Sequence, residues 1–169
     1  RDGKMYLTQG PVMNLYRATI DNDMYKKDDW MNKYFIQKGS EQTESFSWEK
    51  KGGAAVITME KYFGCLNQSW GFHCTSVYTV YSGGQVKVQL TGKTIQNGKE
   101  EPEFLPRIGV VMKAAGSLQK TAWYGLGPQE NYPDSKEAVS MGVYESTVEG
   151  LGTKYVFPQA NGPREAVKW

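Results

Sequence analysis

Two carboxylates in one loop are the side chains whose types and spacing could support acid–base chemistry. Glu130 and Asp134 lie within residues 127–134, a segment rich in turn-forming residues and flanked by aromatic residues. Glycoside hydrolysis requires two carboxylates that face each other across a sugar. A carboxylate in such a loop can equally accept hydrogen bonds from backbone N–H groups and so hold the loop in one shape. Spacing alone does not favour catalysis, so a structural role is the preferred interpretation.

A second group of candidate ligands is the acidic cluster within residues 21–29. A calcium loop of the EF-hand type that began at Asp21 would need glycine at its sixth position and a bidentate glutamate at its twelfth. These positions hold Lys26 and Asn32, so that type of calcium site is excluded. A looser cation site stays open, but side chains that bond to local backbone and cap a short helix are favoured. No metal site is predicted.

Histidine and cysteine offer little further chemistry. His73 is the single histidine, which excludes metal sites built on several imidazoles of this chain. It falls in mid-strand without a nearby serine, aspartate or cysteine partner, so a solvated or hydrogen-bonded side chain is expected. Cys65 and Cys74 lack the C-x-x-C spacing and are expected to be small buried side chains of a protein in a reducing compartment.

Charge and hydropathy exclude several classes of function. Twenty Lys and Arg residues against 18 Asp and Glu give a net charge of +2, without the basic stripe of a nucleic-acid-binding protein. The longest apolar runs, such as residues 54–59, are far too short to span a bilayer. No secretory leader follows Arg1, so a cytoplasmic location is expected.

The elements that must position these groups are predicted to be strands. Apolar and polar residues alternate with period two in most segments, which is typical of antiparallel strands with one buried face. The expected strands lie at residues 44–50, 55–63, 70–82, 86–90, 104–115, 121–124, 138–148 and 155–157. Only residues 28–34 are predicted to be helical, over at most two turns. About eight strands at these spacings favour a sandwich, and the whole chain is expected to be one all-β unit.

Alternation and glycines also predict faces and turns. Phe46 and Trp48 are expected on the buried face of their strand. Glycine pairs at 52–53 and 83–84 are expected to close two hairpins, because glycine accepts the positive φ that tight turns require. Pro106 is expected to mark an edge or a bulge at the start of its strand.

Four blocks of sequence form longer motifs. Two of the blocks are Asn-Leu-Tyr-Arg-Ala-Thr-Ile-Asp-Asn-Asp at 14–23 and Leu-Pro-Arg-Ile-Gly at 105–109. The other two are Trp-Tyr-Gly-Leu-Gly-Pro-Gln-Glu-Asn-Tyr-Pro-Asp at 123–134 and Tyr-Val-Phe-Pro-Gln-Ala-Asn-Gly-Pro-Arg at 155–164. In this order the blocks resemble the C-terminal β-sandwich, or small-chain domain, of family 2 β-galactosidases. Tyr16, Thr19 and Ala160 depart from the family's tryptophan, proline and glutamate.

The resemblance implies a fold and a set of motif residues. The fold is an antiparallel β-supersandwich similar to galactose mutarotases, with residues 1–169 as a single domain fragment truncated on its C-terminal side. The blocks supply the structural candidates Arg17, Asp21, Asn22, Asp23, Arg107, Glu130, Asn131, Tyr132, Asp134, Asn161 and Arg164. The catalytic glutamates of the family lie on a barrel earlier in the parent chain, so no residue of this chain is assigned a catalytic role.

The resemblance further implies a non-catalytic structural and subunit-contact domain of a β-galactosidase that acts on terminal β-D-galactosides with retention. Its expected partners are the rest of the chain or a large subunit in an oligomeric parent, with a galactoside as a further candidate. No cofactor is expected in this chain, and any use of magnesium or sodium ions is placed with the parent enzyme. An autonomous carbohydrate-binding module is the alternative. Aldose epimerisation is disfavoured, because it needs a positioned acid and base and His73 is the only imidazole.

Overall fold

A computed structural model describes residues 3–96 and 100–169 of the chain. The chain divides into two compact units. Unit 1 comprises residues 1–4, 10–17 and 23–112, and unit 2 comprises residues 5–9, 18–22 and 113–169. Antiparallel strands dominate both units, which confirms the predicted all-β class. The expectation of a single domain over residues 1–169 with a supersandwich fold stays a prediction.

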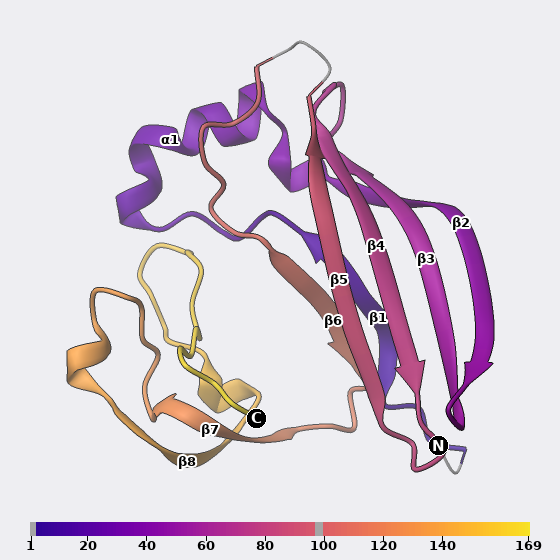
Figure 1. The fold of residues 1–169 in the computed structure, drawn as a ribbon. Helices are drawn as coiled ribbons and strands as arrows, with labels where there is room; N and C mark the ends of the chain where they lie inside the picture. The colour runs from indigo at the N-terminus through magenta and orange to yellow at the C-terminus, as the bar shows by residue number, and fades with distance from the viewer. Residues whose placement is uncertain (1–2, 97–99) are drawn as a thin grey trace. The chain divides into compact units, whose positions relative to one another are not determined.

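Unit 1 is built around a four-stranded antiparallel sheet (Figure 1). Its strands in spatial order are β2 (Ser40–Lys51), β3 (Ala54–Gly64), β4 (Gly71–Val80) and β5 (Val86–Ile95). The predicted hairpins are confirmed, since Gly52 and Gly53 have φ of 57° and 78° and Gly84 has φ of 84°. Strands β2, β3 and β5 are longer than the alternation alone indicates, because their ladder hydrogen bonds continue beyond the apolar positions. Strand β4 is shorter than the predicted 70–82, since its ladder pairs only residues 71–80.

Two further strands form a separate pair whose ends belong to different units. Strand β1 (Leu7–Asn14) is hydrogen-bonded to β6 (Gly109–Ala114). Strand β1 was not predicted, because Gly10 and Pro11 interrupt its apolar pattern. Strand β6 begins only after Pro106, which lacks the N–H that a ladder needs, so the expected strand start at residue 104 is wrong.

A short helical segment precedes the large sheet of unit 1. It comprises the 3₁₀ turn η1 (Asp21–Asp23), the helix α1 (Met24–Asp28), the π-helical turn η2 (Asp29–Lys33) and the 3₁₀ turn η3 (Ile36–Lys38). The helix therefore begins before the predicted residue 28. The expected caps are also wrong: neither Asp23 nor Asp28 makes a side-chain cap hydrogen bond.

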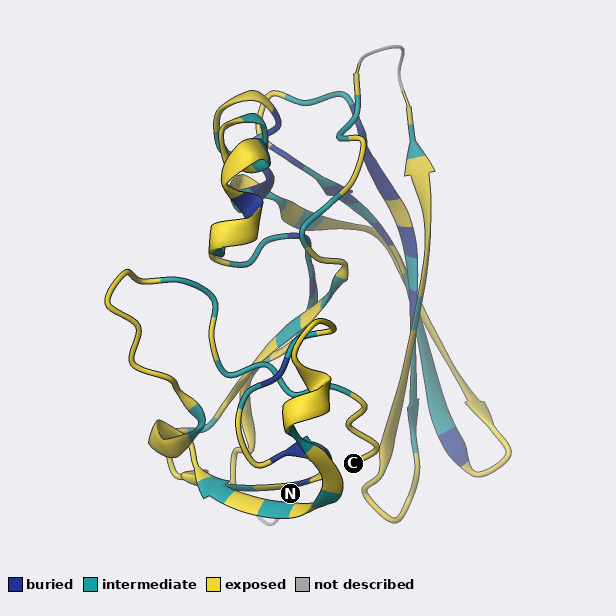
Figure 2. Cartoon of the chain, turned by 90° about the vertical axis from the view of Figure 1, so that its left-hand side faces the viewer, coloured by how far each residue is buried: buried dark blue, intermediate teal, exposed yellow. Residues whose placement is uncertain are grey.

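The core of unit 1 lies on one face of one half of the large sheet (Figure 2). It contains Met13, Leu15, Trp30, Tyr34, Ile36, Phe63, Cys65, Trp70, Phe72 and Cys74. Phe46 and Trp48 were expected to be buried but are 61% and 67% exposed. Their ladder partners on β3 place Phe46 and Trp48 on the same face of the sheet as Phe63. They lie on the edge strand β2, near its hairpin with β3, where the buried cluster no longer covers that face. The odd or even position of a residue indicates on which face of its strand it lies. It does not indicate whether another element covers that face.

Unit 2 is built on the antiparallel pair β7 (Lys120–Gly127) and β8 (Ser140–Thr147), with the 3₁₀ turns η4 (Lys136–Ala138) and η5 (Glu149–Leu151). The last residues of the chain run alongside β7. Tyr124 donates its N–H to the Trp169 carbonyl over 2.9 Å and accepts from the Lys168 N–H over 2.8 Å. The predicted strand at 155–157 is wrong: these residues form an exposed loop that no ladder reaches.

No helix in the described residues has both the length and the apolar character that crossing a membrane requires.

Candidate functional site

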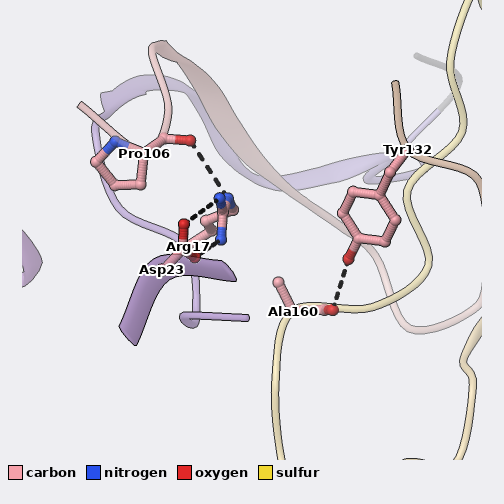
Figure 3. A network of polar contacts seen from close by, with 5 residues as sticks. All are labelled: Arg17, Asp23, Pro106, Tyr132 and Ala160. Atoms are coloured by element: carbon pink, nitrogen blue, oxygen red, sulfur yellow. Dashed lines mark hydrogen bonds and ion pairs between the residues drawn. The ribbon is translucent and has the colours of Figure 1, made fainter. Parts of the chain in front are cut away.

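The first two sequence blocks meet at a partly buried ion pair in unit 1 (Figure 3). The guanidinium of Arg17 donates from Nη2 to Asp23 Oδ1 over 3.1 Å and from Nη1 to Asp23 Oδ2. Its Nε donates to the Pro106 carbonyl over 3.3 Å. Asp23 is only 7% exposed, so the two-point arginine–carboxylate contact is shielded from water. The pair joins the start of the helical segment to residues 105–109.

The other polar members of these blocks lie outside that ion pair. Asp21 and Asn22 are exposed on η1, and Arg107 is exposed before β6. Among residues 3–96 and 100–169, no three His, Cys, Asp or Glu side chains gather as metal ligands do. Asp23, the buried acid of the cluster, binds a guanidinium instead of the helix backbone.

The last two blocks meet in unit 2, where Glu130 joins them. Its Oε2 accepts a hydrogen bond from the Gly162 N–H over 2.7 Å, and its Oε1 accepts from the Tyr155 hydroxyl. Both carboxylate oxygens are thus engaged by the fourth block. Such an acceptor satisfies backbone and hydroxyl donors that no strand ladder reaches.

Asn131 is the most buried polar residue of this region and has no exposed surface. Its Nδ2 donates to the Gln129 carbonyl over 3.1 Å, and its Oδ1 accepts from the Glu165 N–H over 2.9 Å. Its backbone N–H donates to the Pro163 carbonyl over 3.1 Å. The side chain and backbone of one residue therefore hold the 127–134 loop against residues 163–165.

Tyr132, Asn161 and Asp134 are three further members of the predicted set. The Tyr132 hydroxyl donates to the Ala160 carbonyl over 2.8 Å (Figure 3). Asn161 donates from Nδ2 to the Thr153 carbonyl over 3.1 Å, which closes the loop between them. Asp134 is exposed in the turn that follows Tyr132. The structure thus uses most of the predicted residues of these blocks as internal hydrogen-bonding groups.

Arg164 covers one face of an indole ring. Its guanidinium carbon lies 5.2 Å from the centroid of Trp123, and Nη1 donates to the Pro163 carbonyl over 3.1 Å. Its Nε is buried without a hydrogen-bond partner. Burial lowers the pKa of Arg164, and the negative charge of Glu130 acts in the opposite direction.

A shallow hollow of about 270 Å³ lies beside this pair. Its walls include Trp123, Gln129, Glu130, Glu145, Ser146 and Arg164. Because Arg164 lies over the ring of the largely buried Trp123, that indole is not an open platform for a sugar. The oxygens of Glu130 already have donors, so the hollow does not present a free nucleophilic carboxylate from this residue.

A second ion pair, which is buried, was not predicted. Lys61 Nζ lies 2.9 Å from Glu41 Oε2, and the two side chains are 8% and 9% exposed. The Met13 N–H donates to Glu41 Oε1 over 2.7 Å, which links β1 to the large sheet. The alternation of apolar residues at 55, 57, 59 and 63 places Lys61 on the buried face. A lysine at that position indicates a buried acidic partner.

His73 and the two cysteines agree with their predicted roles. His73 is exposed on β4, with Nδ1 3.4 Å from Glu44 Oε2. Cys65 and Cys74 are buried and free. Burial raises the pKa of Cys65 to about 12, and burial also raises the pKa of Cys74.

Comparison with known families gives a match over the whole chain. A family model described as the β-galactosidase small chain matches residues 1–169. The chain belongs to the β-galactosidase small-chain family. The resemblance inferred from the four blocks is therefore confirmed.

Curated relatives of this small-chain sequence are named β-galactosidases. A protein of Vibrio cholerae is 36% identical over 184 residues, which cover 97% of this chain and 16% of the relative. A protein of Halalkalibacterium halodurans is 27% identical over 171 residues, covering 98% of this chain and 16% of the relative. A protein of Lactobacillus delbrueckii subsp. bulgaricus is 30% identical over 174 residues, which cover 99% of this chain and 16% of the relative. The small-chain sequence thus spans about 16% of the length of these relatives.

Proposed function

We propose that residues 1–169 serve as a non-catalytic structural and subunit-contact domain of a β-galactosidase. The observation that carries this proposal is the engagement of Glu130, whose two carboxylate oxygens accept from Gly162 and Tyr155. A nucleophile or a general base needs an oxygen that faces the substrate, whereas both oxygens of Glu130 face donors of the domain itself. Glu130 instead holds one block of the domain against another.

The parent enzyme would hydrolyse terminal β-D-galactosides with retention of configuration. In that mechanism one carboxylate attacks the anomeric carbon and a second protonates the leaving oxygen, which gives a covalent galactosyl-enzyme. Both carboxylates are proposed to lie in the part of the enzyme outside residues 1–169. The role of this domain is to complete the shape of that enzyme.

The proposed partner is the rest of the β-galactosidase chain or a large subunit, in an oligomeric and cytoplasmic enzyme. Two features support a role as a packing domain. One buried and one partly buried ion pair hold unit 1 together, and large apolar side chains are exposed in both units. A galactoside is a partner of the parent enzyme in this proposal. Any requirement for magnesium or sodium ions belongs to the parent.

Hydrolysis of a chromogenic β-galactoside by the 169-residue chain tests the non-catalytic role. We expect no turnover above background, with the complete parent enzyme as the positive control. Turnover that survives repurification and disappears on Glu130→Gln would overturn the proposal. Glu49→Gln is the matched control, because Glu49 is an exposed glutamate on β2.

Isothermal titration of the same chain with galactose and lactose tests the alternative of a carbohydrate-binding module. The scaffold role predicts no binding heat. Binding with a millimolar or tighter dissociation constant would favour the module instead. Trp48 and Trp169 are the exposed indoles that such binding would use, and their substitution by alanine would identify the site.

A further inference from the structure

The loop that contains residues 155–157 presents two adjacent apolar side chains to solvent. Val156 is 92% exposed and Phe157 is 81% exposed. A single exposed apolar residue is ordinary on a protein surface, but two large neighbours at a loop tip form a compact apolar projection. We name Val156 and Phe157 the apolar knob.

Hydrogen bonds hold both ends of this loop. On one side the Tyr155 hydroxyl donates to Glu130, and the Thr153 carbonyl accepts from Asn161 over 3.1 Å. On the other side the Ala160 carbonyl accepts from Tyr132 over 2.8 Å. The knob is therefore presented on a fixed support. A loop whose ends are already held loses less backbone conformational entropy when a partner covers its tip.

We infer that the apolar knob packs into an apolar recess on the part of the parent β-galactosidase that lies outside residues 1–169. This inference rests on the proposed function and names the residues of one contact. The chain spans only about 16% of the length of its relatives, so most of the polypeptide that could form such a recess lies outside it. Anchors of this kind, buried in a pocket and surrounded by a polar rim, contribute most to protein contacts.

The chemistry of the tip favours a protein recess over a sugar. The side chains of Val156 and Phe157 carry no hydrogen-bond donor or acceptor. A sugar requires several convergent polar groups, whereas an apolar recess requires none. Lys154, two residues before Val156, is the nearest charged residue in sequence and is exposed.

Cysteine labelling of Val156→Cys tests this contact. The native thiols are a low background in the chain, because Cys65 and Cys74 are 7% and 2% exposed. In the 169-residue chain, a maleimide should label Cys-substituted position 156 as fast as it does after unfolding in urea. In the complete parent enzyme we expect labelling at least about tenfold slower, since the reagent must wait for the contact to open. The parent enzyme without the substitution gives the background of its other cysteines.

Equal labelling rates in the chain and in the complete enzyme would overturn the inference. A second pair of variants gives an independent test. Phe157→Ser should leave the unfolding of the 169-residue chain unchanged, yet lower the thermal midpoint of the complete enzyme, and Phe157→Leu should preserve that midpoint. An unchanged midpoint of the complete enzyme with Phe157→Ser would also overturn it. The hydrolysis of β-galactosides by the parent enzyme is measured separately. The inferred contact of the apolar knob can therefore be contradicted while the proposed function holds, and the proposed function can be contradicted while the contact holds.

Discussion

The ammonium of Lys61 lies 2.9 Å from the carboxylate of Glu41 within the core face of the large sheet. The Met13 N–H on β1 donates to the other oxygen of that carboxylate over 2.7 Å. One buried acid thus joins β1, β2 and β3. Removing one member of a buried pair leaves an uncompensated charge, whereas removing both charges together is often tolerated.

Lys61→Met should therefore lower the free energy of unfolding by about 3–5 kcal/mol, because the Glu41 charge stays buried without its partner. The double variant Glu41→Gln with Lys61→Met should recover most of that loss, since glutamine still accepts from Met13. Urea unfolding of both variants measures the difference, with Lys50→Met as the exposed control. A double variant as unstable as the single one would contradict this account of the pair.

Asp23 gives a second stability prediction, now for the ion pair with Arg17. Asp23→Asn should cost about 1–3 kcal/mol, because the partly buried guanidinium loses a charged acceptor. Asp21→Asn is the matched control on the same 3₁₀ turn, and an exposed site should change stability by less than about 0.5 kcal/mol. Equal midpoints for the two variants in urea would show that the contact with Asp23 does not stabilise the fold.

The thiol of Cys65 should show its burial in the pH dependence of alkylation. Its pKa is raised to about 12, so the native thiol stays protonated between pH 8 and 10 and alkylation by iodoacetamide stays slow. In the unfolded chain the thiol ionises near its ordinary pKa of about 8.5, and the rate rises over the same range. The folded chain keeps this proton up to a higher pH than the unfolded chain does. The contribution of Cys65 to the free energy of unfolding therefore falls as pH rises from about 9 towards 12. A native rate that follows the unfolded one would contradict the burial.

Chelation should leave the thermal midpoint of the chain unchanged, because the acidic cluster uses Asp23 for Arg17 and leaves Asp21 exposed. A melt with and without EDTA measures this directly. A fall of several degrees that calcium or magnesium restores would reveal a structural ion at residues 21–29.

Sequence predicted the strands of unit 1 well because their alternation and glycine turns are local features. The hairpins at Gly52–Gly53 and Gly83–Gly84 follow from backbone conformations that favour glycine. Strand β1 was not predicted, because it pairs with residues of β6 that lie about 100 positions away in the sequence. A partner so distant leaves no pattern in the local sequence. The exposure of Trp48 was not predicted for a related reason: alternation identifies the face of a strand but not which part of that face is covered.

The candidate residues were identified as motifs, but their pairing was not predictable. No spacing in the sequence indicates that block 14–23 contacts block 105–109, or that Glu130 binds Gly162. The residues at 155–157 have the composition of a strand, yet side-chain hydrogen bonds at both ends hold them as a loop. Lys61 was not among the candidates, although a lysine on a predicted buried face was a signal that could have indicated a buried acidic partner.

The central claim is that Glu130 supports structure and not catalysis, and the free energy of unfolding of Glu130→Ala tests it most directly. The substitution leaves the Gly162 N–H and the Tyr155 hydroxyl without their acceptor, so we expect a loss of about 1–3 kcal/mol. For a chain of this size that is a fall of several degrees in thermal midpoint. Asp134→Ala, in the same loop but exposed, should leave the midpoint nearly unchanged. A Glu130→Ala chain that melts at the wild-type temperature would contradict the account.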